Sequence, residues 1–132
     1  MITDLNTFKQ LLKNVYPEIV EADNGVLNLT LDDINISIAS LSENDDYVLF
    51  RAKVLDMSTL QRKGEFALAA LSGNFFWSGT NGGKLSLGPD NVLYLNERRP
   101  LDEFIHVQDI EDCFDEISGA VTDWRVRGDL YA

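Results

Sequence analysis

The sequence predicts an α+β domain with the element order αβββαββα, in which helices cover one face of an antiparallel twisted sheet. Apolar residues recur every three or four positions near both ends of the chain, which is typical of amphipathic helices. Between these segments, apolar and polar residues alternate with a period of two, which is typical of half-buried strands. The chain has 132 residues, the usual size of one domain, so residues 1–132 are expected to form a single domain.

The first helix is predicted from an apolar stripe that begins at Ile2 and ends at Val15. Thr3 or Asp4 can serve as its N-cap, and Pro17 ends it because proline clashes with the preceding helical turn. The alternating pattern that follows predicts three strands joined by short acidic turns, over residues 26–31, 34–38 and 47–55.

Ser58 followed by Gln61 is a capping-box pattern, which predicts a second helix over residues 58–72 that Gly73 ends. Its alanine-rich part, residues 66–71, would let another element approach closely. Strands over residues 84–87 and 92–95 flank a turn at residues 88–91, a hairpin signature. Pro100 suits the first position of a last helix. The apolar stripe of that helix is Phe104, Val107, Ile110, Phe114, Ile117, Val121 and Trp124.

The charge balance argues against several classes of partner. Eleven Lys and Arg residues stand against 22 Asp and Glu residues, a net charge of −11. Such a chain repels phosphate backbones and anionic lipids, so nucleic acids and membranes are not expected partners.

No apolar run approaches the roughly 20 residues of a membrane helix, and the N-terminus lacks signal-peptide features. The single cysteine, Cys113, fits a reducing compartment, so the protein is expected to be cytoplasmic.

The sequence offers little for catalysis or metal binding. His106 and Cys113 are seven residues apart on one predicted helix, about 10 Å along its axis, too far for a nucleophile–base pair. The glycine run of residues 78–85 lacks the first glycine and the final hydroxyl residue of a phosphate-binding loop. The acids of the last helix lack metal-ligand spacing and are expected to form a solvated face. No enzyme, cofactor, metal or small-molecule substrate is therefore expected.

The predicted helices and strands have more apolar faces than packing the helices on one face of the sheet can bury. Residues 34–38, with isoleucine at every second position, and the aromatic run 75–77 are candidates for a surface that meets another chain. The alternative interpretation of each is ordinary core. The high negative charge, the lack of catalytic or metal-binding motifs and the excess of apolar faces together favour a binding protein.

Four segments carry a resemblance to a known family: residues 66–77, 81–85, 92–95 and 99–102. An alanine-rich helix is followed by an aromatic step, a glycine pair, two strands and a Pro-Leu-Asp helix start. With the element order of the whole chain, they resemble the class I type III secretion chaperones, most of all the CesT (Tir chaperone) family. The resemblance covers essentially the whole chain.

The resemblance implies a small, acidic, non-enzymatic homodimer in the bacterial cytoplasm. It would bind the N-terminal chaperone-binding segment of one or a few secreted effector proteins, keeping it soluble and secretion-competent. Apolar grooves and strand addition at a sheet edge would hold that segment. The residues expected to bind the effector are Leu5, Phe8, Leu12, Ile34, Ile36 and Ile38. Those expected at the dimer interface are Phe66, Ala69, Ala70, Gly73, Phe75, Trp77 and Leu85.

Two other functions remain open at this point. A non-secretory adaptor or regulatory protein on the same fold would bind a partner that is not exported. A small hydrolase or ligand-binding domain would need a deep pocket with convergent polar groups, whereas a chaperone needs shallow apolar grooves.

Overall fold

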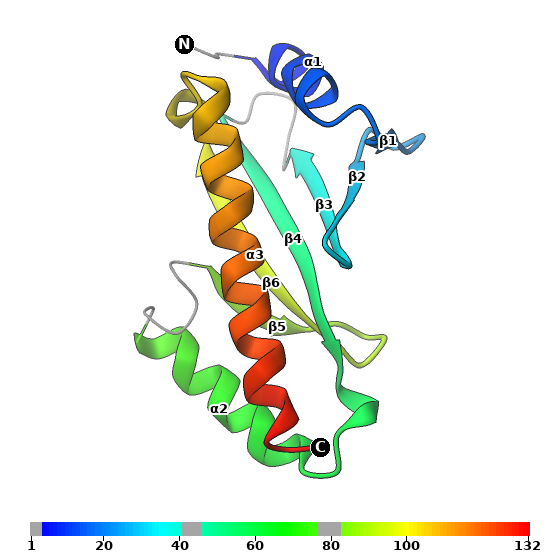
Figure 1. Ribbon diagram of the computed structural model, residues 1–132, viewed down its shortest axis with the longest axis vertical. Helices are drawn as coiled ribbons and strands as arrows, with labels where there is room; N and C mark the ends of the chain where they lie inside the picture. Colours follow the sequence, from blue (N-terminus) through cyan, green and yellow to red (C-terminus); the bar gives the residue numbers. More distant parts are fainter. Residues whose placement is uncertain (1–3, 41–45, 77–82) are drawn as a thin grey trace.

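Three helices pack on one face and at the two ends of an antiparallel sheet in the computed structural model, which describes residues 4–40, 46–76 and 83–132 (Figure 1). The described strands follow one another across the sheet in the order β1-β2-β3-β4-β6-β5. Their bounds are β1 Val20–Glu21, β2 Leu27–Leu31, β3 Ile34–Ser40, β4 Tyr47–Asp56, β5 Lys84–Leu87 and β6 Val92–Pro100. The helices are α1 Leu5–Val15, α2 Lys63–Phe76 and α3 Val107–Asp129. The predicted α+β class is confirmed, with the two-residue strand β1 as an addition.

The first helix and the first three predicted strands form where the sequence predicts them. The Asp4 carboxylate caps α1 by accepting a 2.8 Å hydrogen bond from the backbone N–H of Thr7. Asp32 and Asp33 both have positive φ, at 49° and 66°, in the two-residue turn between β2 and β3. Such a turn matches the twist of the flanking strands, which explains why two acids suffice to join them.

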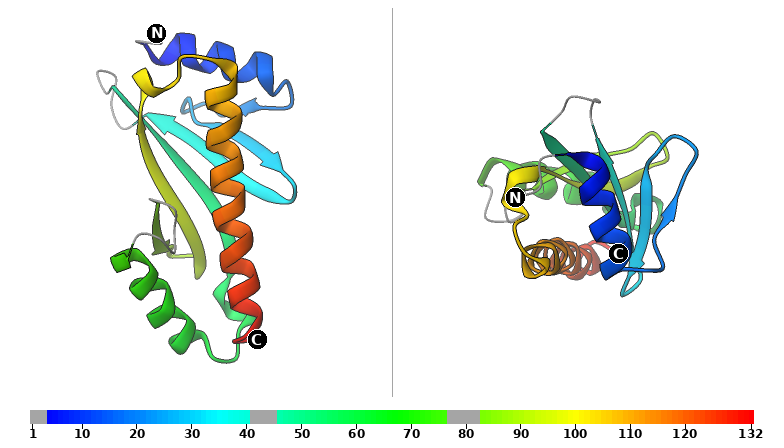
Figure 2. Two further views of the ribbon diagram at one scale, coloured as in Figure 1. Left: turned by 60° about the vertical axis from the view of Figure 1, so that its left-hand side comes forward. Right: turned by 90° about the horizontal axis from the view of Figure 1, so that it is seen from above.

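The core lies between the sheet and the two helices α1 and α3. α3 runs along one face of the sheet for most of the length of the molecule, and α1 lies across one end of that face (Figures 1 and 2). Phe8 of α1, Phe50 of β4 and Phe114 of α3 meet there, with Phe104 beside them. Their ring centroids lie 4.9–6.5 Å apart. The predicted stripe of the last helix faces this core except at Val107, which is 44% exposed.

The second helix begins later than predicted, so the capping-box prediction is wrong. Asp56 accepts the backbone N–H of Ser58 at 2.9 Å, which starts a short 3-10 helix, Met57–Thr59. α2 starts at Lys63, where the backbone N–H of Arg62 donates to the carbonyl of Tyr131 at 3.0 Å. A contact with the far end of the chain therefore fixes this boundary. The predicted stop at Gly73 is also wrong, because α2 continues through it to Phe76.

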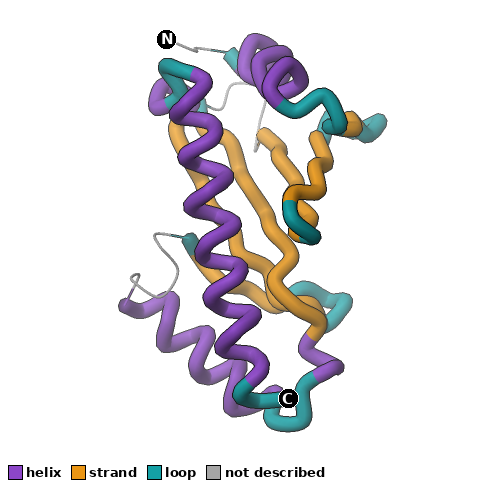
Figure 3. The backbone as a smooth tube through the Cα atoms, in the orientation of Figure 1, coloured by secondary structure: helices purple, strands orange, loops and turns teal. Residues whose placement is uncertain are grey.

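The last helix also begins later than predicted. Pro100 is the final residue of β6, where it pairs with Tyr47, and a short 3-10 helix, Leu101–Glu103, follows it. α3 starts at Val107, where the Asp109 carboxylate accepts the N–H groups of Ile105 and His106. Figure 3 shows the resulting layout, with helices along one side and at both ends of the strands.

Candidate partner-binding surfaces

One face of α2 is fixed against the rest of the chain by aromatic packing. Phe66 is fully buried, and its ring lies 6.0 Å from that of Trp124 in α3. A Cβ atom at Gly73 would lie 2.5 Å from Cζ2 of Trp124, closer than real side chains approach. Glycine is needed here because its missing side chain makes room for the indole.

A side chain of α2 also bonds to the edge of the sheet. The amide nitrogen of Asn74 donates to the Leu85 carbonyl at 2.9 Å, and the Asn74 oxygen accepts the Leu85 N–H at 2.6 Å. β5 is the last strand of the described sheet and pairs with β6 on one side only. Asn74 therefore bonds to the free edge of β5 as a further strand would. This pair of bonds fixes the rotation of α2 relative to the sheet.

That rotation leaves an apolar stripe on the outer face of α2, which we call the α2 stripe. It consists of Leu68, Leu71 and Phe75, which are 67%, 64% and 78% exposed. Their spacing of three and four residues places them on one side of a helix, opposite Phe66. Neighbouring exposed apolar side chains mark a surface that another chain can cover.

The structure separates the residues predicted at the dimer interface into two groups. Phe66, Ala70, Gly73 and Leu85 are buried within the chain and fix the position of α2 and β5. Ala69 is partly buried, and Phe75 belongs to the exposed α2 stripe. Trp77 lies outside the described residues. Leu68 and Leu71 were not predicted at the interface, although their spacing of three and four residues from one another and from Phe75 indicates one helix face.

The residues predicted to bind an effector come together in the core. Phe8, Leu12, Ile34, Ile36 and Ile38 are at most 2% exposed, and Leu5 packs against them. In the single chain their side chains face α1, the sheet and α3 rather than the surface. A partner would reach them if α1 moved away from the sheet, so the predicted contact stays a prediction.

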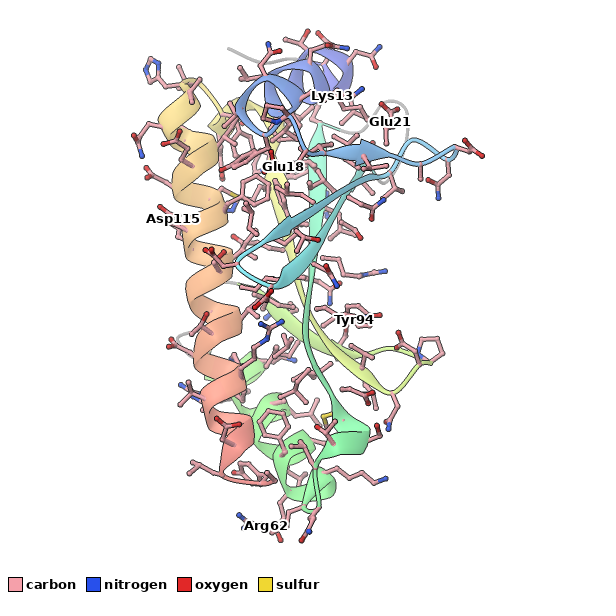
Figure 4. All side chains as sticks on the ribbon, turned by 45° about the vertical axis from the view of Figure 1, so that its right-hand side comes forward. Lys13, Glu18, Glu21, Arg62, Tyr94 and Asp115 are labelled. Atoms are coloured by element: carbon pink, nitrogen blue, oxygen red, sulfur yellow. The ribbon has the colours of Figure 1, made fainter. Side chains whose placement is uncertain are left out.

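Beside these core residues lies a sheet edge that the sequence did not predict. β1 pairs with β2 on one side, and the Val20 side chain is 66% exposed. Lys13 of α1 donates to the Glu21 carboxylate at 2.6 Å, and this bond lowers the pKa of Glu21 (Figure 4). Lys9 donates to the carbonyl of Gly25 at 2.7 Å. The two lysines hold the edge strand next to α1. A strand of two residues with exposed side chains is too short for the alternation pattern to detect.

Cys113, one of the two residues considered for catalysis, lies beside a structural ion-pair cluster, and the other, His106, lies outside it. Arg99 of β6 bonds to Glu97 and to Glu116 of α3, and Glu97 is 8% exposed. Burial raises the pKa of Glu97, while the charge of Arg99 opposes that effect. Burial also raises the pKa of the nearby Cys113 thiol to about 12, so it stays protonated near neutral pH. His106 is exposed at the start of α3. Within the described residues, no group of acids, histidine and cysteine could hold a metal.

A profile of the Tir chaperone protein (CesT) family matches residues 5–125, from the start of α1 into the last two turns of α3. The chain belongs to this family. The match spans every described strand, α1, α2 and most of α3, so the family assignment applies to the fold as a whole. None of the curated proteins matches the chain.

Three solved structures share the fold of this family member. The ExsC–ExsE complex matches with 16% identity and a TM-score of 0.75, over 92% of this chain and 94% of the other. The HopA1–SchA chaperone–effector complex matches with 15% identity and a TM-score of 0.67, over 89% and 92%. The Yersinia pestis type III secretion chaperone SycH, in complex with a fragment of YscM2, matches with 14% identity and a TM-score of 0.61, over 89% and 96%. In the described part of this chain, no helix has the length and apolar composition needed to cross a bilayer.

Proposed function

We propose that this CesT family member is a type III secretion chaperone. It binds the N-terminal chaperone-binding segment of one or a few effector proteins in the bacterial cytoplasm and keeps it soluble until export. The observation that carries the proposal is the family match over residues 5–125. The shared fold with a chaperone–effector complex and with a type III secretion chaperone supports it. The proposed chaperone binds its effector and does not catalyse a reaction. Burial of apolar side chains and backbone hydrogen bonds stabilise the complex.

The proposed chaperone is a homodimer that buries the α2 stripe. Two copies related by a two-fold axis would bring the stripe of one α2 against that of the other, covering Leu68, Leu71 and Phe75. The contacts of Phe66 and Asn74 with the rest of the chain hold α2 in the orientation that presents this stripe. Ala69 lies beside the buried face of α2, where it is partly buried against the core.

The dimer is tested by the molar mass of variants in solution. Leu71→Glu places a charge within the α2 stripe, and Ala69→Glu places one at a partly buried position of the same helix, so both should give monomers. Val126→Glu is the matched control, because Val126 is an equally exposed apolar residue on α3, at 62%. A Leu71→Glu protein that stays dimeric would contradict the interface, as would a control that dissociates to the same extent.

The proposed effector segment adds a strand at the open edge of β1, next to α1. β1 has a partner strand on one side, and the exposed Val20 side chain supplies an apolar contact on its surface. Strand addition uses backbone hydrogen bonds, so it tolerates different effector sequences. Val20→Asp should weaken this contact without disturbing the core, whereas Ile105→Asp, at another exposed apolar position, should leave it unchanged.

The function is tested by comparing bound proteins with exported proteins in the bacterium that carries the gene. The tagged chaperone should capture a protein that also appears in the secreted fraction, and secretion of that protein should fall when the chaperone is deleted. Capture of a protein that is never secreted would instead support the adaptor function on the same fold. In that case the dimer and the fold would stand, and the secretory role would not.

A further inference from the structure

The face of the sheet that α3 does not cover is hollowed. An open trough of about 660 Å³, which we call the outer trough, reaches from Val20 of β1 across β2, β3, β4 and β6. Its lining includes Asn28, Asn35, Ser37, Arg51, Lys53 and Tyr94. A second hollow of about 560 Å³ shares Ser37, Arg51 and Tyr94 with it and continues toward the turn between β5 and β6. Figure 4 shows Tyr94 on this side of the sheet and Asp115 of α3 on the other.

The outer trough differs in charge from the rest of the molecule. The chain carries −11 overall, and the exposed face of α3 contributes Glu111, Asp112 and Asp115. In contrast, the outward-facing positions of β2 to β6 that the structure describes carry one acid, Asp56 at the end of β4, and β4 also places Arg51 and Lys53 there. Glu18 and Asp90 line the two ends of the combined hollow. Hydrogen bonds with Ser58 lower the pKa of Asp56, and the charge of Lys53 adds a smaller effect. The molecule is thus polarised, with acids on the helix side and cations in the trough.

The cations of the trough are not neutralised by ion pairs. Arg51 donates through Nε to the Asn96 side chain at 2.7 Å, a neutral partner. The Tyr94 hydroxyl donates to the Asp90 carboxylate at 2.6 Å and lowers the pKa of Asp90, and the charge of Lys53 adds a smaller effect without forming a salt bridge. Among the described residues, neither Arg51 nor Lys53 forms a salt bridge with an acid.

The polar side chains around these cations also present donors. The Asn35 oxygen accepts the Thr30 hydroxyl at 2.9 Å, and the Asn28 oxygen accepts the Ser37 hydroxyl at 3.1 Å. What the two asparagines offer a ligand is therefore mainly their amide N–H groups. A surface of cations and amide donors fits a ligand that is rich in acceptors, such as carboxylates and backbone carbonyls.

We propose that the outer trough binds an extended, acidic segment of the partner polypeptide. An extended chain fits an open, elongated hollow, and its acids would pair with Arg51 and Lys53 while its carbonyls accept from the asparagines. The inference rests on the proposed function, because the segment is part of the effector that the chaperone holds. It places a second contact, polar in character, on the face of the sheet that adjoins the β1 edge at Val20.

The test is an NMR titration of the ¹⁵N-labelled full chain with a synthetic peptide that alternates Glu with Ser and Thr. Amides of β2, β3 and β4 around the trough should shift, and affinity should fall as salt is raised. The same peptide with Gln in place of Glu should not bind measurably. Shifts confined to other surfaces, or equal binding of the Gln peptide, would overturn the proposal.

Charge-matched variants locate the interaction. Arg51→Gln with Lys53→Gln should weaken binding of the acidic peptide by roughly five- to tenfold, since two exposed ion pairs are lost. Lys63→Gln with Arg127→Gln removes the same charge from α2 and α3 and should leave binding unchanged. Equal weakening by both pairs would mean a general charge effect and would refute the trough. Dimerisation and capture of a secreted protein by the Arg51 and Lys53 variant report separately on the proposed function.

A second copy of the chain could offer its acidic α3 instead. In that case the free protein would form species larger than a dimer as its concentration rises, and Arg51→Gln with Lys53→Gln would abolish them. That outcome would also overturn the proposal, because the occupant would then be another copy of this chain.

Discussion

Arg125 of α3 donates a 2.6 Å hydrogen bond through Nε to the backbone carbonyl of Val54 in β4. The pairing of β4 with β6 shifts register at this point, so the Arg125 side chain bonds to the backbone where the ladder is interrupted. Its Nη2 also lies 3.3 Å from the carbonyls of Asp33 and Lys53. One side chain thus joins the long helix to the irregular part of β4 and to the turn between β2 and β3.

Loss of this side chain should destabilise the fold. Arg125→Gln should lower the free energy of unfolding by about 1–3 kcal/mol, the usual cost of losing charged hydrogen bonds to backbone groups. Lys63→Gln removes the same charge from an exposed position of α2 and should change little. Urea unfolding of both variants measures the difference. Equal stability of the two would show that the Arg125 contacts contribute nothing.

Two helical glycines should respond in opposite ways to alanine. Gly73→Ala should destabilise the protein by about 1–3 kcal/mol, because the new Cβ would overlap the Trp124 indole. Gly119→Ala should stabilise it by about 0.5–1 kcal/mol, because no atom lies within 4 Å of that Cβ and alanine favours the helix. Thermal unfolding compares them directly. A stabilising Gly73→Ala would contradict the close approach of α2 and α3.

The start of α3 should make stability depend on pH. The backbone N–H groups of His106 and Ile105 hold the pKa of Asp109 below its ordinary 3.8. A lowered pKa contributes stability that is fully present above the unfolded value and is lost as pH falls through the folded value. Asp109→Asn should therefore lower Tm at neutral pH, and the difference from the wild type should shrink below about pH 4. Asp115→Asn serves as the control, and a Tm difference for Asp109→Asn that stays constant with pH would contradict the charge effect.

Cys113 should be unreactive until the protein unfolds. Its side chain is buried, and burial raises the pKa of its thiol to about 12. Because the thiolate is the reactive form, a disulfide reagent such as DTNB should label the native protein slowly and the urea-unfolded protein at once. Rapid labelling of the native protein at neutral pH would show that this part of the core opens readily.

The sequence predicted those parts of the fold that depend on local periodicity. Each of these elements has apolar residues on one side, which faces a single packed neighbour. They are α1, the strands β2 to β4 and the hairpin of β5 and β6. The boundaries of α2 and α3 could not be predicted, because Tyr131 contacts the chain just before α2 and Tyr47 pairs with Pro100. Contacts between residues distant in sequence leave no local pattern.

The candidate surfaces were harder to predict for a related reason. An apolar residue looks the same in a sequence whether it faces the core or a partner, so Phe8 and Ile36 were expected at a surface although the chain buries them. The direction in which α2 presents Leu71 depends on its contacts with Trp124 and Leu85, which the sequence does not reveal. The cations of the outer trough stand out only once the strands align them.

Native mass spectrometry of the complex purified from its own bacterium tests the central claim most directly. The account predicts a dimer of about 30 kDa, twice the 14.8 kDa chain, bound to one secreted protein whose protease-protected segment lies near its N-terminus. A monomer without any protein partner would contradict both the dimer and the chaperone function.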